Sequence, residues 1–210
     1  MRPVICMITD GSLRMGERAD PLVTRVRTAA QSGVHLVQIR EPGLDDRTVL
    51  ELVRACLDAV HGTPARLIVN DRLDVALAAG AHGVHLKQQS VPAHRARALA
   101  PRGFLVGQSI HAPGEATTAA ESVDYLVFGT VFETSSKPGR AAAGTATLAQ
   151  AVAATPVPVL AIGGVTEDNA AMVAHTGAAG IAAIRLFASG DVSSAVHRLA
   201  QSFDLQVPGS

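Results

Sequence analysis

Residues 79–86 read AGAHGVHL, and this short stretch contains the local pattern from which the fold can be predicted. An Ala-rich segment ends at Gly80, and an apolar run over Gly83–Leu86 follows closely. Glycine often closes a helix C-terminus because it adopts the left-handed conformation without steric cost. The same arrangement recurs at residues 31–35 (QSGVH) and 176–181 (TGAAGI). We therefore expect a helix to end at each of these glycines, with the next strand directly after it.

Short aliphatic runs recur along the whole chain, and each ends in polar or glycine-containing residues. They are Val4–Thr9, His35–Arg40, Leu67–Asn70, Gly83–Leu86, Phe104–Ser109, Tyr125–Phe132, Pro158–Gly163 and Gly180–Leu186. Between them lie stretches with helical spacing: Pro21–Gln31, Asp46–Val60, Leu73–Ala79, Ala93–Leu99, Gly114–Ser122, Thr147–Ala154, Glu167–His175 and Val192–Phe203. This alternation implies parallel strands joined by right-handed helical crossovers.

We predict an α/β fold, a single (β/α)8 TIM barrel over residues 1–205, with residues 206–210 as a disordered tail. An open, doubly wound sheet is the alternative. The eight strand–helix repeats and the absence of a GxGxxG motif after the first strand favour the closed barrel.

The composition limits the class of protein. Hydrophobic residues make up 48% of the 210 residues and charged residues 17%, which is typical of a globular chain. The 18 basic residues balance the 18 acidic ones, which argues against a nucleic-acid partner. Cys6 and Cys56 lie in apolar segments and are expected to be buried, reduced thiols. With no leader or membrane-spanning run in view, we expect a cytoplasmic protein without a membrane partner.

The carboxyl ends of the strands are where a closed barrel carries its chemistry. Gly163 and Gly164 follow the seventh run, before a helix that we expect to begin near Thr166. Glycine lets backbone amides approach a ligand, and amides at such a turn attract phosphate oxygens. A phosphate site is therefore predicted here, with a simple tight turn as the alternative.

A hydroxyl-rich, basic loop follows the sixth run. Its residues Thr134, Ser136 and Lys137 could wrap an anionic group, with the lysine as a point charge. The alternative is a solvated surface loop.

Polar residues also end the second and third runs. Gln38 and Arg40 alternate and so share one face of the strand. An inward arginine needs an anionic partner, which is either a ligand or one of the carboxylates Glu41 and Asp71. Asn70 could recognise a ring through its amide and Asp71 could bind Mg²⁺, although this dipeptide is equally suited to capping a helix.

Four histidines lie near strand ends. His35 and His82 stand at strand entrances and are expected at the lower face of the barrel, whereas the role of His85 stays open. His111 follows the fifth run and is the best-placed candidate for a general base. The alternative is a histidine that only makes a structural hydrogen bond.

The motifs at the strand ends resemble, in order, those of the thiamine phosphate synthase/TenI superfamily. They are Ile8–Asp10, Gln38–Glu41, Asn70–Ala76, Gly83–Leu86, Gly107 with Ser109, Asp124–Tyr125 with Gly129, Thr134–Lys137 and Ala161–Gly164. The resemblance extends over residues 5–187 and is nearer to the TenI branch.

This resemblance implies one of two reactions. Synthases of the superfamily join a pyrimidine pyrophosphate to a thiazole phosphate with Mg²⁺, whereas TenI-type tautomerases move a ring proton of a thiazole phosphate without metal. The implied thiazole phosphate contacts are Thr134, Ser136, Gly163 and Gly164. The implied pyrimidine contacts are Gln38, Asn70 and Ser109, and the implied pyrophosphate contacts are Arg40 and Lys137.

Two departures weaken the synthase interpretation. Synthases usually carry a lysine where this chain has Pro42, and a second Mg²⁺ carboxylate in the segment that reads KQQS here, residues 87–90. Only Asp71 remains as a metal ligand of a synthase-like site. Losing a lysine and a carboxylate together weakens stabilisation of the departing pyrophosphate.

The TenI interpretation has a gap of its own. TenI tautomerases place a proton-transferring histidine directly after the glycine of strand six, where this chain has Thr130. A hydroxyl is a poor general base at neutral pH, so His111, or a water held by Thr130, would have to substitute. Arg185, where relatives commonly have serine, could add a phosphate contact or form a salt bridge to Glu133 or Asp10.

From the sequence alone we expect a TenI-like thiazole tautomerase in thiamine biosynthesis that needs no cofactor. The alternatives are a divergent Mg²⁺-dependent synthase and a non-catalytic protein that binds thiazole phosphate. Other thiamine-pathway enzymes and further copies of the chain are possible partners.

Overall fold

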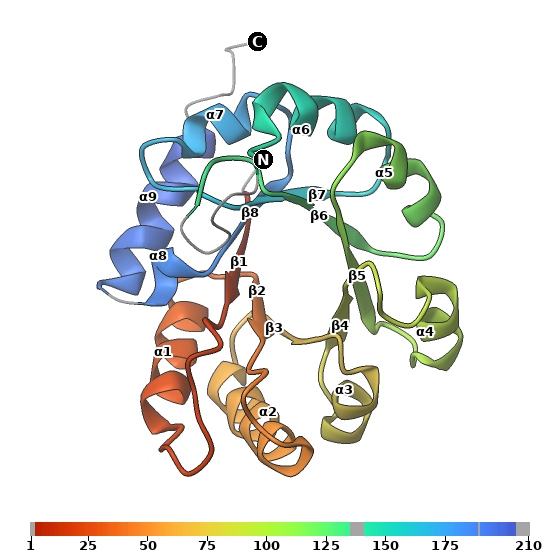
Figure 1. Ribbon diagram of the computed structural model, residues 1–210. Coiled ribbons are helices and arrows are strands. Elements are labelled where there is room, and N and C mark those ends of the chain that lie inside the picture. The colour runs from red at the N-terminus through yellow and green to blue at the C-terminus, as the bar shows by residue number, and fades with distance from the viewer. Residues whose placement is uncertain (1–2, 135–140, 189, 205–210) are drawn as a thin grey trace.

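A computed structural model describes residues 3–134, 141–188 and 190–204 of the chain. Within these residues, eight parallel strands close into a barrel in sequence order, because β1 pairs with both β2 and β8 (Figure 1). The strands are β1 Val4–Ile8, β2 Leu36–Ile39, β3 Arg66–Asn70, β4 Gly83–Leu86, β5 Leu105–Ile110, β6 Tyr125–Gly129, β7 Val159–Ile162 and β8 Gly180–Ala183. The predicted (β/α)8 barrel is confirmed.

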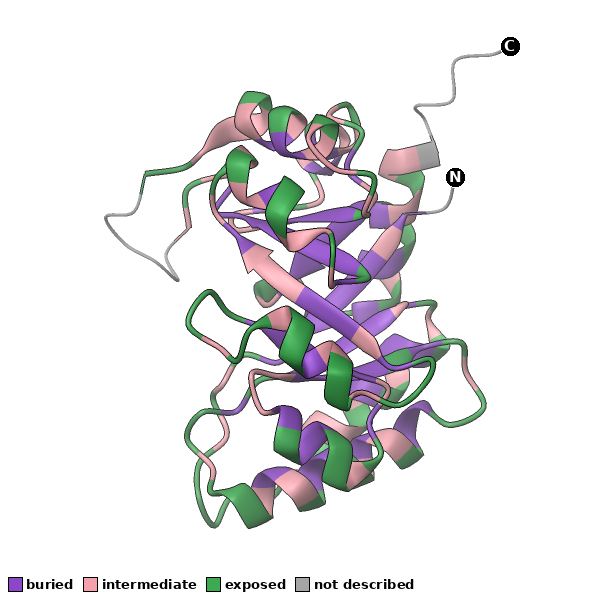
Figure 2. Ribbon diagram, turned by 90° about the vertical axis from the view of Figure 1, so that its right-hand side faces the viewer, coloured by how far each residue is buried: buried purple, intermediate pink, exposed green. Residues whose placement is uncertain are grey.

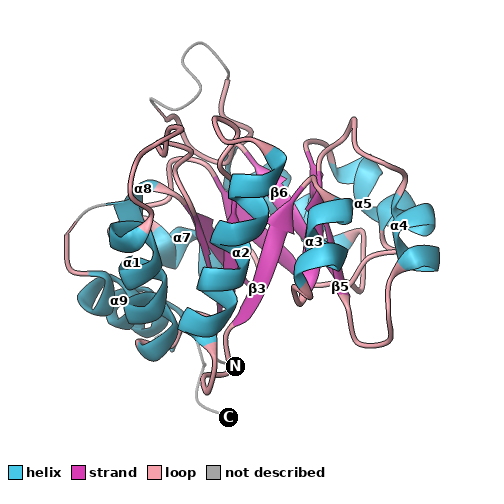
Figure 3. Cartoon of the chain, turned by 90° about the horizontal axis from the view of Figure 1, so that it is seen from below, coloured by secondary structure: helices cyan, strands magenta, loops and turns pink. Residues whose placement is uncertain are grey.

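Helices surround the barrel and cover the outer face of the strands (Figure 3). They are α1 Asp20–Gln31, α2 Asp46–Val60, α3 Leu73–Ala79, α4 Ala93–Leu99, α5 Pro113–Ala119, α6 Gly144–Ala153, α7 Ala170–Ala174, α8 Arg185–Ala188 and α9 Val192–Asp204. Within the described residues, every helix is too short or too polar to span a bilayer.

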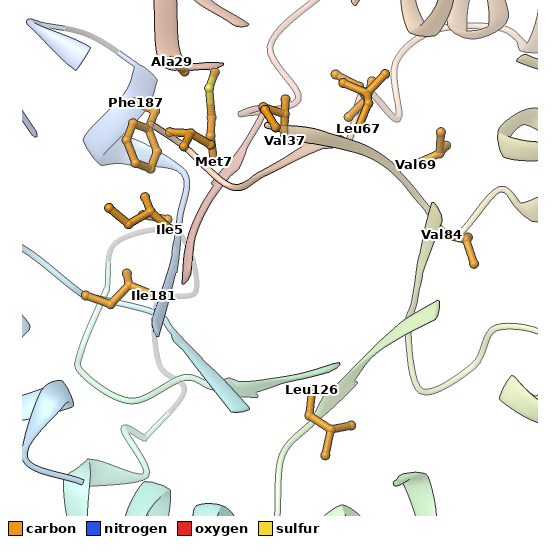
Figure 4. Packing of buried hydrophobic residues seen from close by; sticks show 14 of the residues in the cluster. Ile5, Met7, Ala29, Val37, Leu67, Val69, Val84, Leu126, Ile181 and Phe187 are labelled. Carbon is orange, nitrogen blue, oxygen red and sulfur yellow. The ribbon is translucent and has the colours of Figure 1, made fainter. Parts of the chain in front are cut away.

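The side chains of each strand alternate between two separate cores, as the period of two requires. On β1, Ile5 and Met7 point outward and belong to the larger cluster, which packs between the barrel and the helices. Figure 4 shows part of this cluster. Cys6 and Ile8 of the same strand belong to a smaller cluster inside the barrel, with Tyr125. Figure 2 shows the result as buried strands covered by helices whose outer faces are exposed. Both cysteines are buried and free, as predicted.

The lower face of the barrel follows the glycine pattern of the sequence. Gly33, Gly80 and Gly177 all have positive φ, at +99°, +72° and +79°, and each precedes a strand by a few residues. His35 and His82 lie here: their Nδ1 atoms accept backbone hydrogen bonds from Ile5 and Leu67. The two histidines are thus structural, as expected.

Several predicted boundaries at the upper face are wrong, and the sixth strand, expected to reach Phe132, ends at Gly129. The eighth strand was expected to reach Leu186, but it ends at Ala183, where its pairing with β1 ends at Met7, and Arg185 begins the short helix α8. The helix expected near Thr166 begins only at Ala170. The intervening residues form a loop, because the Asn169 side chain accepts a hydrogen bond from the Thr166 amide (2.8 Å) and donates one to the Gly164 carbonyl (2.9 Å).

Candidate active site

A small cavity of about 80 Å³ lies between the loops that follow β6, β7 and β8. Its lining residues are Thr130, Thr134, Ile162, Gly163, Gly164, Val165, Ala182, Ala183, Ile184 and Arg185. This is the place where such barrels commonly bind a phosphate group. The structure therefore brings together the predicted residues Thr134, Gly163, Gly164 and Arg185, whereas Ser136 and Lys137 lie outside the described residues.

Only glycine fits at the two central positions of this cavity. Gly163 and Gly164 have φ of +97° and +65°. A Cβ atom at Gly163 would lie 2.5 Å from Thr130 Cγ2, and one at Gly164 would lie 2.4 Å from the Glu133 carbonyl oxygen. Because the backbone after β7 packs directly on the loop after β6, its peptide groups can line the cavity.

Arg185 stands at the mouth of the same cavity. Its Nη2 donates a hydrogen bond to Thr134 Oγ1 at 3.3 Å, so the tip of β8 is joined to the loop after β6. Arg185 thus lines the predicted phosphate cavity from the first residue of α8, and not from the strand where it was expected.

A second, much larger cleft of about 720 Å³ opens beside the small cavity. It is lined by Ile8, Asp10, Gln38, Arg40, Asn70, Asp71, His85, Lys87, Gln88, Gln89, Ser109, His111, Val127, Ile162 and Ile184. Ile162 and Ile184 line both spaces, so the two adjoin. The cleft gathers the predicted residues Gln38, Arg40, Asn70, Asp71, Ser109 and His111 from the tips of β2, β3 and β5.

Gln38 and Asn70 form an amide pair at the bottom of the cleft. Gln38 is 3% exposed, and its Nε2 donates to Asn70 Oδ1 at 3.0 Å. Its Oε1 is buried and has no hydrogen-bond partner among the described residues. An unsatisfied buried acceptor costs about 1–3 kcal/mol, so a ligand with an N–H donor would be favoured there.

His85 occupies the floor of the cleft beside this pair. Its Nε2 lies 2.9 Å from Ser109 Oγ, and its Nδ1 lies 3.3 Å from the Tyr125 hydroxyl. Burial lowers the pKa of His85 to about 4 and raises the pKa of Tyr125, so both groups are neutral near pH 7. His85 therefore offers hydrogen bonds to Ser109 and Tyr125 and adds no charge to the site.

We expect the His85→Gln variant to lose less stability than the wild type when the pH falls from about 7 to about 5. In the unfolded chain the imidazole has its ordinary pKa of about 6.5. In the folded protein burial lowers this pKa to about 4, so between the two values the unfolded state binds more protons. Stability therefore falls as the pH falls, by about 2 kcal/mol at a pH of about 5.

Urea denaturation at the two pH values measures this loss in each variant. His82→Gln is the matched comparison, because His82 is only half-buried and its pKa is lowered by burial and by Arg66. His82→Gln should therefore reduce the pH-dependent loss of stability by less than His85→Gln does. Equal losses in the wild type and in His85→Gln would contradict the assignment.

The carboxylates near Arg40 are engaged elsewhere. Glu41 accepts hydrogen bonds from the amides of Gly11 (3.3 Å) and Leu13 (3.0 Å), and Asp71 pairs with the Lys87 ammonium. Arg40 itself is exposed and lines the cleft. The proposed ligand contact of Arg40 is therefore compatible with the geometry.

Asp71 is the candidate metal ligand, and it already has two polar partners. Lys87 Nζ and Ser90 Oγ both bind its carboxylate. Burial alone would raise the pKa of Asp71, but these hydrogen bonds and the lysine charge hold it below its ordinary value. Across the described residues no group of three His, Cys, Asp or Glu side chains could hold a metal ion. The carboxylate of Asp71 is thus already shared with an ammonium, whose positive charge opposes the approach of a divalent cation.

The two proposed catalytic residues flank Gly129. His111 Nδ1 lies 2.6 Å from the Gly129 carbonyl oxygen, and because a carbonyl only accepts, Nδ1 carries a hydrogen. In the neutral ring Nε2 is then the acceptor, as a general base requires. Thr130 is buried and lines the small cavity, whereas His111 lines the large cleft.

Several contacts of the site were not predicted from the sequence. Lys87 and Ser90 reach Asp71 from the loop after β4, Tyr125 reaches His85 from β6, and Asn169 holds the glycine loop. A signal existed for Lys87 and Ser90, since they stand in the segment that departs from the superfamily pattern. Tyr125 stands in a superfamily motif that carried no assigned role, and Asn169 gave no signal, because a polar side chain before a helix is common.

Comparison with known proteins places the chain in one family. Residues 5–187 match the family model described as thiamine monophosphate synthase. The chain is 39% identical over 199 residues to a thiamine-phosphate synthase of Methanoculleus marisnigri, covering 92% of each protein. It is 39% identical over 184 residues to that of Chlorobium limicola, covering 87% of this chain and 84% of the relative. A solved thiamine phosphate pyrophosphorylase from Pyrococcus furiosus superposes with a TM-score of 0.83 at 31% identity, covering 98% of this chain and 97% of that one.

Proposed function

Since the chain belongs to the thiamine monophosphate synthase family, we propose that it joins a pyrimidine pyrophosphate to a thiazole phosphate and releases pyrophosphate. The sequence alone left this reaction as the alternative to a tautomerase. The names of the relatives favour the synthase, and they support an enzyme of thiamine biosynthesis.

The observation that carries the proposal is the presence of two adjoining spaces that share Ile162 and Ile184. A tautomerase acts on one substrate and has no second molecule to bind. A condensing enzyme needs a second space, and here that space is large, polar and contains the unpartnered oxygen of Gln38. This division supports a reaction between two bound molecules.

In this proposal the small cavity holds the phosphate of the thiazole. Backbone groups at Gly163 and Gly164, the Thr134 hydroxyl and the Arg185 guanidinium surround it, and Ser136 and Lys137 remain candidates from the residues outside the described part. Anions bind well to such a combination of amides and a guanidinium.

The large cleft holds the pyrimidine. Gln38, Asn70 and Ser109 offer amide and hydroxyl groups to ring nitrogens and an amino group, and the neutral His85 keeps the Ser109 hydroxyl in place. A ring amino group would supply the donor that Gln38 Oε1 needs. Arg40 stands at the rim of the same cleft, where it would face the pyrophosphate.

The reaction itself requires little acid–base chemistry. The thiazole nitrogen forms a bond to the methylene carbon of the pyrimidine, while the bond from that carbon to the pyrophosphate oxygen breaks and its electron pair leaves with the pyrophosphate. Catalysis then consists of aligning the two rings and stabilising the departing negative charge. The shared wall of Ile162 and Ile184 marks the place where the two rings would meet.

The tautomerase remains a second candidate because of one contact. The hydrogen bond from His111 Nδ1 to Gly129 leaves Nε2 able to accept a proton in the large cleft, which adjoins the small cavity. In that case His111 would be the base, with Thr130 in the position that TenI proteins give to histidine.

The purified protein, incubated with thiazole phosphate and pyrimidine pyrophosphate, should form thiamine phosphate and release pyrophosphate. Chromatography of the products measures this reaction, and the same assay with the thiazole carboxylate tautomer measures the alternative. Tautomer turnover that is lost in His111→Ala, without condensation, would overturn the synthase proposal. Tight thiazole phosphate binding without either reaction would instead indicate a binding protein.

The Gln38→Leu variant tests whether the two substrates bind in separate spaces. It removes the amide from the large cleft and leaves the small cavity intact. We expect calorimetry to show pyrimidine pyrophosphate binding weakened about tenfold or more, with thiazole phosphate affinity unchanged.

A further inference from the structure

The tip of β3 and the loop after β4 meet in a cluster of three polar side chains. Asp71 follows β3, and its carboxylate binds both Lys87 Nζ and Ser90 Oγ. Ser90 Oγ also accepts a hydrogen bond from the Lys87 backbone amide at 2.7 Å. The loop is therefore closed on itself, which fixes the start of the lysine side chain next to the carboxylate.

The formal charges of this cluster balance without any bound ion. A divalent cation held by two carboxylates has a formal sum of zero. One ammonium beside one carboxylate has the same sum, and Lys87 beside Asp71 is such a pair. A divalent ion placed on Asp71 would have to displace the lysine or lie beside its positive charge, and both are unfavourable.

We propose that Lys87 is the resident cation of this site, and that the large cleft binds a pyrophosphate group through Lys87 and Arg40 without a divalent metal ion. The inference rests on the proposed function for the identity of the ligand. It goes beyond that function in stating how the pyrophosphate is held.

The Lys87 side chain is exposed and lies in the large cleft, where a ligand can reach it. This side chain is 55% exposed and lines the same cleft as Arg40, while the Asp71 side chain is 30% exposed. An ammonium has three hydrogens, so the contact with Asp71 leaves hydrogens that can bind ligand oxygens. Asp71 thus acts as a positioning residue that holds the ammonium at the rim, which reduces the entropy lost on binding.

Calorimetry with inorganic pyrophosphate tests the proposal on the intact protein. In buffer with EDTA we expect binding, and addition of Mg²⁺ should change the affinity by no more than about threefold. Lys87→Ala should weaken binding in EDTA about tenfold or more, as expected for loss of a charge-assisted contact. Arg102→Ala, which removes a positive charge from the exposed lower loop before β5, should have no effect.

A second pair of variants asks whether the lysine stands where a metal would bind. Lys87→Gly combined with Ser90→Asp restores two carboxylates and removes the ammonium. This double variant should bind Mn²⁺, which is measured as a loss of the free-ion signal in electron paramagnetic resonance. Its pyrophosphate binding should require Mg²⁺. The wild type should bind no Mn²⁺ under the same conditions.

Three results would overturn the inference. They are pyrophosphate binding that appears only with Mg²⁺, Mn²⁺ binding by the wild type, and no pyrophosphate binding under any condition. Thiazole phosphate is titrated in the same series, because its binding in the small cavity depends on neither Lys87 nor Asp71. If it binds and condensation proceeds only with Mg²⁺, the proposed function stands and the resident-cation inference fails.

Discussion

Gly164→Ala is expected to weaken thiazole phosphate binding by roughly a hundredfold, equivalent to about 2.8 kcal/mol. Gly164 has φ of +65°, and a Cβ atom there would lie 2.4 Å from the Glu133 carbonyl oxygen and 2.7 Å from Phe132 Cβ. These atoms belong to the loop after β6, so the methyl group must push that loop away from the loop after β7. Since the small cavity lies between the two loops, its shape changes where the phosphate is proposed to bind.

Calorimetric titration of thiazole phosphate into the variant checks this expectation. Gly62→Ala is the control, because Gly62 has φ of +77° with nothing within 4 Å of its Cβ position, and it lies between α2 and β3 at the lower face. That variant suffers the same left-handed backbone strain without a clash. Equal affinities in Gly164→Ala and Gly62→Ala would show that the glycine loop does not form the phosphate site.

Gly107→Ala is expected to destabilise the protein by about 3 kcal/mol or more, because it inserts a methyl group into the packed barrel interior. Gly107 on β5 pairs in register with Tyr125 on β6. A Cβ atom at Gly107 would lie 2.1 Å from Tyr125 Cζ and 2.5 Å from its hydroxyl oxygen. The tyrosine cannot move freely, since it is 5% exposed and contacts the ring of His85.

A double-mutant cycle separates this clash from a general loss of strand stability. Tyr125→Ala alone should cost about 3–5 kcal/mol by leaving a cavity. In that background Gly107→Ala should cost close to nothing, because the ring that it met is gone. Gly114→Ala in α5, where a Cβ atom meets nothing within 4 Å, should leave stability unchanged or slightly raised.

Urea denaturation of the four proteins of the cycle gives the coupling energy. If Gly107→Ala does not fold alone, its recovery in the Tyr125→Ala background still reports the coupling. A cost of Gly107→Ala that persists without the tyrosine ring would contradict the steric explanation.

The sequence by itself determined the barrel and which polar residues stand at its strand ends. The alternation on β1, with Ile5 outward and Cys6 inward, follows from the two-residue period of a strand. The glycines before β2, β4 and β8 predicted where helices end, and Gly163 with Gly164 predicted a close-packed turn after β7, which lines the small cavity. These features depend on local backbone preferences, which are properties of short stretches of sequence.

Only the tertiary structure decided which side chains meet at the upper rim. Asp71 could have paired with Arg40, but the loop after β4 brings Lys87 to it. Arg185 was expected on a strand, yet the end of pairing with β1 places it on α8, within reach of Thr134. Such pairings join separate loops through long side chains, so they depend on how barrel closure sets the distances between strand tips. No short stretch of sequence contains those distances, which is why the pairing of Lys87 with Asp71 could be seen only after the barrel was closed.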